Sequence, residues 1–386
     1  MLVFFAAVMA LACSAKHDTE MQVISLSASA GAEPCLFSTN DGATYLSWIE
    51  KHDKKSELKF SKLDGSSWST PALIDSGSTW FVNWADYPMI AAKGNQLIAH
   101  YLDKSADDTF AYDVKITFSS DAGATWSKPA ILHDDGKQVE HGFVSLLPYG
   151  EHFFVAWLDG RNTAADDSHG EHHGQMSLRA AVVNSNGEKI EEWELDNRTC
   201  DCCQTSAALT FNGPVVVYRD RSEDEIRDIS IVRFVNGAWT QPKPVHNDNW
   251  KITGCPVNGP RVVADADRVV VAWFSMPDDN PQVNVIFSEN GGETFGTPVR
   301  VDDGHAIGRV DLAMLDDEGV FVIWMEGKKI MGAKVTTRGK QSAVEIAPSS
   351  GERSSGFPQV TRAGKQLVFA WTDDKEKVVK TAVIAL

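Results

Sequence analysis

The chain has 386 residues and a formal net charge of −17, from 53 acidic against 36 basic side chains. This excess of negative charge argues against nucleic acid or an anionic lipid surface as a partner. Length alone suggests two or three domains, but the internal repeats described below favour one.

The N-terminus reads as an export signal. Residues 1–12 are apolar throughout and are followed by Cys13. An apolar segment of this size suits a signal peptide and is too short to span a bilayer. Ala10-Leu11-Ala12 before Cys13 is similar to a bacterial lipobox, which predicts lipidation of Cys13; the alternative is an ordinary secretory signal cut after Ala12.

Residues 1–20 are therefore expected to be a signal peptide or a lipoprotein tether. The mature protein is expected to be extracytoplasmic, held at the membrane by a lipid anchor and facing the periplasm or the cell surface. No Lys or Arg precedes the apolar run, which leaves the true translation start open.

Next along the chain, one strand pattern recurs seven times. An apolar run ends in an aromatic residue, and in six copies an acid follows two positions later, from Trp48/Glu50 to Trp371/Asp373. The copy at Trp273 lacks the acid. Intervals of roughly 50 to 60 residues suit the four-stranded blade of a β-propeller. We predict an all-β protein with one domain over residues 21–386, a seven-bladed β-propeller, with six blades as the alternative.

A turn motif accompanies these repeats. Asp121 can bond the N–H groups of its own turn, Gly123 can take a positive φ, and Trp126 can bury its ring in the blade. Residues 288–295 repeat the motif with Asn290 in place of Asp. The pattern S-x-D-x-G-x-T-W is carried by Ser119, Asp121, Gly123, Thr125 and Trp126. These turns resemble the Asp-box (BNR) repeats of sialidase-like β-propellers.

The two chain ends complement each other. The last repeat, residues 358–384, stops before its fourth strand, and residues 21–27 look like the fourth strand of other repeats. We predict that this N-terminal strand completes the seventh blade, because joining the ends removes an exposed sheet edge.

The resemblance also implies which loops share a face. In sialidase-like propellers the box turns lie away from the active site, whereas the loops before strand one and between strands two and three lie on the functional face. Applied to this chain, this gathers most of the reactive Cys and His residues on one face, most densely in blades 3 to 5. The residues expected to bind a ligand there are Trp84, His141, Arg161, Arg219, Arg227 and Trp250.

The cysteines point to a metal, disulfides or reactive thiols. Five remain if Cys13 is lipidated, and an odd number in an oxidising compartment leaves one unpaired or points to a metal. Thiolates with imidazoles suit copper or zinc, although no cofactor is certain. Disulfides, for example one of the Cys200 group to Cys255, and free or redox-active thiols are alternatives. The candidate metal ligands are His169, His172, His173, Cys200, Cys202, Cys203 and Cys255.

The resemblance to sialidases further implies an arginine triad that grips the substrate carboxylate, an Asp acid/base, and a Tyr nucleophile assisted by a Glu. This chain departs from that pattern, because it lacks the F/Y-R-I-P arginine motif and no Tyr follows Tyr218. The weak candidates that remain for catalysis are Asp86, Asp159, Arg161, Arg219, Arg221 and Arg309, and salt-bridged loops are the competing explanation for the arginines.

We therefore expect an exported propeller that binds a small molecule, a glycan or a metal on the face formed by blades 3 to 5, with catalysis not established. One alternative is an exo-acting glycoside hydrolase of the sialidase type. The other is a protein-interaction or assembly platform. The ligand and the oligomeric state are left open.

Overall fold

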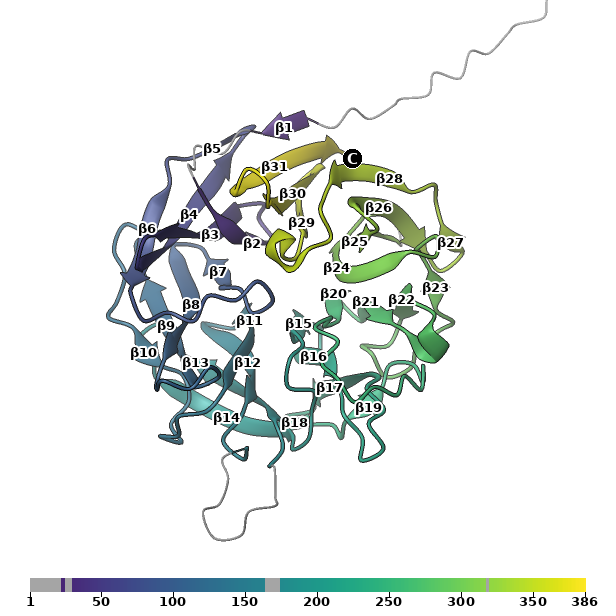
Figure 1. The fold of residues 1–386 in the computed structure, drawn as a ribbon, viewed down its shortest axis with the longest axis horizontal. Helices are drawn as coiled ribbons and strands as arrows, with labels where there is room; N and C mark the ends of the chain where they lie inside the picture. The colour runs from purple at the N-terminus through teal and green to yellow at the C-terminus, as the bar shows by residue number, and fades with distance from the viewer. Residues whose placement is uncertain (1–21, 25–29, 164–173, 317–318) are drawn as a thin grey trace, which may run out of the picture.

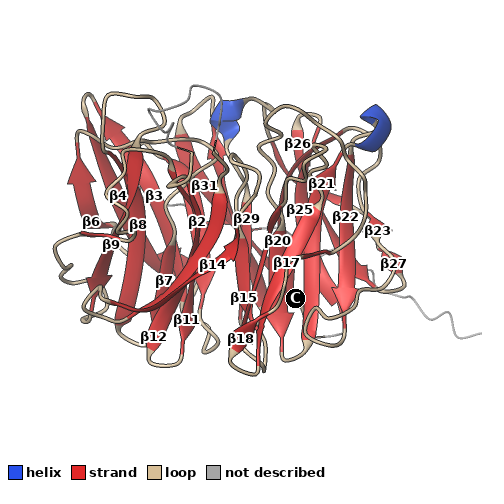
Figure 2. Ribbon diagram, turned by 90° about the horizontal axis from the view of Figure 1, so that it is seen from below, coloured by secondary structure: helices blue, strands red, loops and turns tan. Residues whose placement is uncertain are grey.

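The computed structural model describes residues 22–24, 30–163, 174–316 and 319–386. Seven antiparallel sheets are arranged as a ring around a central axis (Figure 1). Seen from the side, the strands run between two faces covered by loops (Figure 2). The predicted all-β, seven-bladed propeller is confirmed. In the described part of the chain, the helices are two short 3-10 turns, Pro277–Asp279 and Arg353–Ser355.

Each blade begins with the strand nearest the axis. Blades 1 to 3 consist of β2 (Ala32–Ser38), β3 (Thr44–His52), β4 (Lys55–Asp64), β5 (Ser67–Trp68) and β6 (Ala72–Gly77); β7 (Ile90–Lys93), β8 (Gln96–Lys104), β9 (Tyr112–Ser119) and β10 (Ala130–Ile131); and β11 (His141–Tyr149), β12 (His152–Asp159), β13 (Ser177–Val183) and β14 (Lys189–Asp196).

Blades 4 to 6 consist of β15 (Ser206–Leu209), β16 (Pro214–Arg219), β17 (Ile229–Val235), β18 (Ala238–Trp239) and β19 (Lys243–Pro244); β20 (Arg261–Asp265), β21 (Arg268–Ser275), β22 (Gln282–Ser288) and β23 (Val299–Arg300); and β24 (Ala306–Met314), β25 (Gly319–Glu326), β26 (Lys329–Thr336), β27 (Gly339–Lys340) and β28 (Val344–Pro348). Blade 7 consists of β29 (Gln359–Ala363), β30 (Gln366–Asp373), β31 (Val378–Ala385) and β1 (Gln22–Ile24).

The ring is closed by both ends of the chain. The short strand β1 pairs antiparallel with β31, with Gln22 opposite Val383 and Ile24 opposite Thr381. The predicted N-terminal closure of blade 7 is therefore confirmed. Because β1 covers β31, the last blade has four strands, as blades 2, 3 and 5 do, and leaves no unpaired seam in the ring.

Three of the six aromatic–acid pairs are hydrogen bonds inside the blades. The indole N–H of Trp48 donates to Glu50 over 3.0 Å, and Trp157 and Trp324 make the same bond to the acids two positions later, over 2.8 Å each. In blade 5, which lacks that acid, Trp273 donates instead to Asp248 over 2.6 Å. Each of these four buried indole N–H groups thus has an acceptor, as burial of a polar group requires.

The two best-matched turns are built alike. The Ser119 hydroxyl accepts the Gly123 N–H over 2.8 Å, and the Asp121 carboxylate accepts the Thr125 N–H over 2.9 Å. The turn at residues 288–295 makes the same two bonds over 3.0 and 2.9 Å. Gly123 has φ +88°, and the Trp126 ring is half-buried against Phe60 of blade 1 with its centroid 5.8 Å away. The turn therefore packs against the neighbouring blade.

Neighbouring blades are joined near the axis by side chains that accept backbone N–H groups. Asp86 before blade 2 accepts from Phe143 over 2.8 Å, and Asn258 before blade 5 accepts from Arg309 over 2.7 Å. Gln204 and Asp311 make equivalent bonds to the next blade over 3.0 and 2.8 Å. Asp86, Gln204 and Asn258 precede the first strands of their blades and Asp311 lies within β24, so polar residues on or just before the innermost strands hold the ring together.

Candidate metal centre

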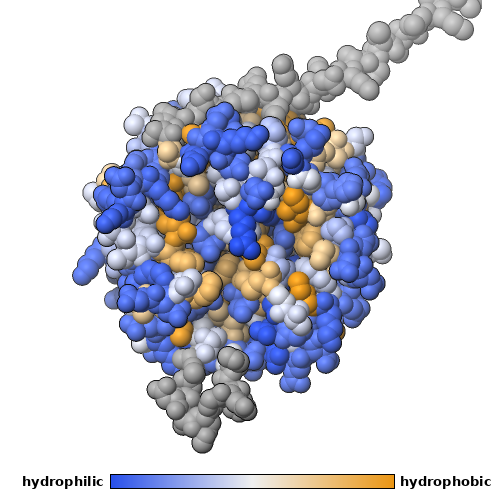
Figure 3. Space-filling model, in the orientation of Figure 1, coloured by the Kyte–Doolittle hydropathy of each residue, from blue (hydrophilic) through white to orange (hydrophobic). Residues whose placement is uncertain are grey.

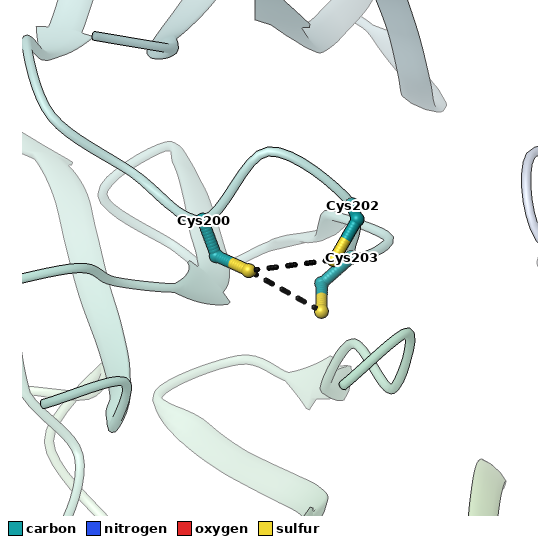
Figure 4. A group of neighbouring side chains, drawn as sticks. All are labelled: Cys200, Cys202 and Cys203. Atoms are coloured by element: carbon teal, nitrogen blue, oxygen red, sulfur yellow. Dashed lines mark hydrogen bonds between the residues drawn. The ribbon is translucent and has the colours of Figure 1, made fainter. Parts of the chain in front are cut away.

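Three thiols gather at the entrance of blade 4. They lie on the loop between β14 and β15, and the Cys200 sulfur is 3.7 Å from both the Cys202 and the Cys203 sulfur (Figure 4). All three sulfur atoms lie within 4.8 Å of one another. Cys200 and Cys203 are buried and Cys202 is half-buried.

The loop that carries these thiols is fixed at both ends. The N–H of Cys200 donates to the carbonyl of Arg219 over 3.1 Å. Past the cluster, the Thr205 hydroxyl donates to the carbonyl of Phe143 over 2.8 Å. Because both anchors belong to sheet strands of blades 3 and 4, the fold itself sets the position of the sulfur atoms.

The charge around Cys200 favours a thiolate. The pKa of Cys200 lies well below its ordinary value, because its sulfur shares hydrogen bonds with the thiols of Cys202 and Cys203 and the Arg227 guanidinium contacts it. The Arg227 Nη1 lies 3.2 Å from the Cys200 sulfur. Burial raises the pKa of Cys203. Cys200 is therefore the thiol of the cluster that loses its proton most readily.

A fourth thiol reaches the cluster from the entrance of blade 5. Cys255 precedes β20 and is exposed, and its sulfur lies 3.5 Å from the Asp201 carboxylate. Asp201, Cys202 and Cys255 offer ligand atoms that all lie within 4.8 Å of one another. Asp201 was missed from the sequence, although its place between two of the cysteines was a signal.

The five described cysteines are free thiols. Cys35 stands apart from the other four, because it is buried in β2 among core side chains, where burial raises its pKa to about 11. The odd count therefore separates into one core thiol and a group of four on two adjacent loops. Cys35 serves below as an internal control.

The arginines expected at a ligand site are engaged by the protein. Arg219 is buried and donates to the carbonyl oxygens of Arg227, Asn258 and Phe274 over 2.6, 2.8 and 2.7 Å. Its guanidinium also lies 4.9 Å from the ring centroid of Trp250. Arg219 therefore ties the blade 4 and blade 5 entrances together.

Three further candidates are also occupied. Arg309 donates to carbonyl groups of the loop before β29. Arg161 binds Asp159 through two nitrogens over 2.8 Å each, and Arg221 binds Glu225 over 2.8 Å. Each of these guanidinium groups donates to acceptors of the protein, and the arginines contact different partners instead of converging on a shared point.

The tryptophans of the blade entrances pack against other rings. Trp84 is half-buried, with its ring centroid 5.7 Å from that of Phe357, and the Arg309 guanidinium lies 4.6 Å from the Trp84 ring. Trp250 is buried beneath Arg219. Hydrophilic residues cover most of the face seen in Figure 3, with apolar residues mainly around its middle.

Asp86 lies in the interior of the ring. Its carboxyl is 3% exposed, and burial raises its pKa well above the ordinary value although the Phe143 N–H bond lowers it. A cavity of about 10 Å³ next to it is lined by Asp86, Tyr87 and Arg261, among others. This volume suits one water molecule and is far below that of a sugar-binding pocket.

A second group of ionisable side chains lies between blades 2 and 3. The Asp135 carboxylate lies 2.7 Å from His133 Nδ1 and 3.2 Å from His141 Nε2. Asp113 is 3.4 Å from His133, and Asp159 is 3.7 Å from His141. The two imidazole rings are stacked 3.5 Å apart at 4°. A metal ion in the plane of one imidazole ring would lie far out of the plane of the other. This arrangement therefore suits a proton shared among these side chains better than a metal ion.

Sequence reasoning found His141 and Asp159 of this group but missed the other three. Although burial opposes it, Asp113 and Asp135 raise the pKa of His133, whereas burial and His133 lower that of His141. The one local signal was the His-x-Asp spacing of residues 133 and 135. Asp113 comes from another strand, β9, and carried no such signal.

Several candidates lie outside the described residues: Cys13, His169, His172 and His173. Within the described residues, no helix is long and apolar enough to cross a bilayer.

No protein-family model and no curated protein matches the sequence. Among solved structures, a protein of unknown function from Dyadobacter fermentans has a TM-score of 0.52 at 14% identity, covering 95% of this chain and 98% of that one. The phage phi92 endosialidase has a TM-score of 0.51 at 9% identity, with 95% and 69% covered. Trypanosoma rangeli sialidase has a TM-score of 0.48 at 12% identity, with 82% and 56% covered. The likeness is one of fold. At that level, the resemblance to sialidase-like propellers is confirmed.

Proposed function

We propose that this propeller binds a thiophilic metal ion, Cu(I) or Zn²⁺, through Cys200, Cys202 and Cys203 at the entrance of blade 4. The observation that carries the proposal is the spacing of the sulfur atoms. A tetrahedral metal with metal–sulfur bonds of about 2.3 Å holds its sulfur ligands about 3.8 Å apart. Cys200 lies 3.7 Å from each of its two neighbours.

The surroundings support a charged metal–thiolate group. Three thiolates around Cu(I) or Zn²⁺ carry a net negative charge, and the Arg227 guanidinium beside Cys200 partly neutralises it. Burial of Cys200 and Cys203 keeps water from competing for the metal. Soft thiolate ligands favour Cu(I) and Zn²⁺ over hard cations such as Mg²⁺.

We further propose that the protein is exported, since residues 1–13 have the composition of a secretion signal. In an oxidising compartment these thiols would otherwise be open to disulfide formation. A bound metal ion would hold them in the thiolate form.

The test is metal binding by reduced protein made without a histidine tag. Cu(I) is titrated anaerobically against bicinchoninate, and Zn²⁺ against a chromophoric chelator. We expect stoichiometric binding that a Cys200→Ser/Cys203→Ser variant loses and a Cys35→Ser variant keeps. Absence of stoichiometric metal in the reduced wild-type protein would overturn the proposal, and disulfides mapped among the four clustered thiols of the protein before reduction would show that they act as staples instead.

A further inference from the structure

Cys202 belongs to two sets of ligand atoms. One set is Cys200, Cys202 and Cys203, and the other is Asp201, Cys202 and Cys255. We name the first the buried set and the second the surface set. Two members of the buried set are 0% and 1% exposed. In the surface set, Cys255 is exposed and the Asp201 side chain is 42% exposed.

The surface set is held in place although it faces solvent. The loop of Cys255 continues into Val257, a β-branched residue with φ +49°. In a β-branched residue such a conformation is strained and persists only where the surroundings impose it. They do so here, because the Asn258 side chain donates to the carbonyls of Pro256 and Ile307 over 3.3 and 3.2 Å.

Arg219 couples this loop to the buried set. Its guanidinium donates to the carbonyls of Asn258 and Arg227, and Arg227 contacts the Cys200 sulfur. The buried Arg219 guanidinium therefore holds both the loop that carries Cys255 and the Arg227 residue whose charge lies beside Cys200. The two sets are built as one unit from the entrances of blades 4 and 5.

We propose that the surface set receives the metal ion and passes it to the buried set, with Cys202 as the ligand common to both. This inference rests on the proposed function. A buried tri-thiolate site by itself gives an incoming metal complex no exposed ligand except the half-buried Cys202. Asp201 and Cys255 supply that first contact, so the protein is suited to metal acquisition and transfer.

The exchange balances without a redox step. The metal keeps its bond to the Cys202 sulfur while its bonds to Asp201 and Cys255 break and bonds to Cys200 and Cys203 form. Any proton that the Cys200 or Cys203 thiol still carries passes to water as its bond to the metal forms, and the released Cys255 thiolate takes up a proton from water. The oxidation state of the metal does not change.

The test separates the rate of exchange from affinity. Reduced wild-type and Cys255→Ser proteins are mixed with the Cu(I)–bicinchoninate complex, and the loss of its colour is followed by stopped flow. We expect both proteins to bind one ion with dissociation constants within about threefold of each other. Loading of Cys255→Ser should be slower by about tenfold or more. Asp201→Asn should show a smaller slowing, and Cys35→Ser, which alters a thiol outside both sets, none.

Three results would overturn the transfer proposal while leaving the metal site intact. They are equal loading rates for wild type and Cys255→Ser, a loss of affinity in Cys255→Ser as large as in Cys203→Ser, and binding of two ions by wild type. The first would remove Cys255 from the path, the second would make it a permanent ligand, and the third would mean that both sets fill together. No binding by wild type would instead remove the proposed function itself.

Discussion

The Nη1 of Arg227 lies 3.2 Å from the sulfur of Cys200, while its Nη2 lies 2.9 Å from the Glu225 carboxylate. The guanidinium is 2% exposed and joins the thiol cluster to the loop between β16 and β17. A charge-assisted contact of this kind is stronger than one between neutral groups. Arg227 is therefore the residue through which the surrounding loops tune the cluster.

Arg227→Gln is expected to weaken Cu(I) binding by about tenfold, because the thiolates lose the cation that partly neutralises them. Arg227→Lys keeps the charge, so its Cu(I) affinity should lie between that of wild type and that of Arg227→Gln. The measurement is the bicinchoninate competition described above, with circular dichroism to confirm folding. Unchanged affinity in the folded Gln variant would contradict this role for the guanidinium.

Metal should stabilise the fold if it binds only the native loops. With free Zn²⁺ at 100 times the dissociation constant, the free energy of unfolding should rise by about 2.7 kcal/mol. Thermal unfolding with and without metal measures the change. Cys200→Ser/Cys203→Ser should show no metal-dependent rise, whereas a rise equal to that of wild type would place the metal elsewhere.

Asp86 is expected to act through the blade 2 to blade 3 contact. Burial raises the pKa of Asp86 well above its ordinary value and so disfavours the charged form, and Asn has nearly the same shape and keeps an acceptor for the Phe143 N–H. Asp86→Asn should change stability little, whereas Asp86→Ala should cost about 1–3 kcal/mol. Urea unfolding of the two variants is the measurement. Equal losses would show that the carboxyl has a role that Asn cannot fill.

The buried side chain of His100 is expected to make the fold less stable in acid. It is 0% exposed in β8, burial lowers its pKa to about 3, and its Nδ1 accepts the N–H of Met89 over 3.1 Å. Between the ordinary histidine pKa of about 6.5 and about 3, the unfolded chain binds a proton that the folded chain does not. This residue should therefore lower stability by about 1.4 kcal/mol per pH unit as pH falls.

His100→Asn keeps an acceptor in place of Nδ1 but does not titrate in this range. Its free energy of unfolding, measured by urea unfolding from pH 7 to pH 4, should depend less on pH than that of wild type. Parallel curves for the two proteins would show that other groups carry the acid sensitivity.

The blade count and the closure of the ring could be predicted because each blade repeats a local pattern. Trp48 and Trp157 find their acceptors two residues away, so a spacing along the chain corresponds to a contact in space. For Trp273, the spacing along the chain does not predict the contact. Its acceptor, Asp248, lies 25 residues upstream, at the entrance of the same blade.

The roles of the loop side chains could not be predicted in the same way. Arg219 reads in the sequence as a possible clamp for an anionic ligand, yet its donors are taken by carbonyl groups of Arg227, Asn258 and Phe274. Those partners come from two blades, and their positions follow only from assembly of the ring. The thiol cluster was easier to predict, because three of its four cysteines lie within four residues of sequence.

The pairing of Ile24 with Thr381 also constrains how the protein is made. On a ribosome, β1 has to stay unpaired until β31 emerges, so the ring is sealed only once β31 has been synthesised. Contacts this distant along the chain are slow to form. Removing residues 22–24, or fusing a bulky partner directly to them, should therefore impair maturation of the entire propeller, including blades far from the seam.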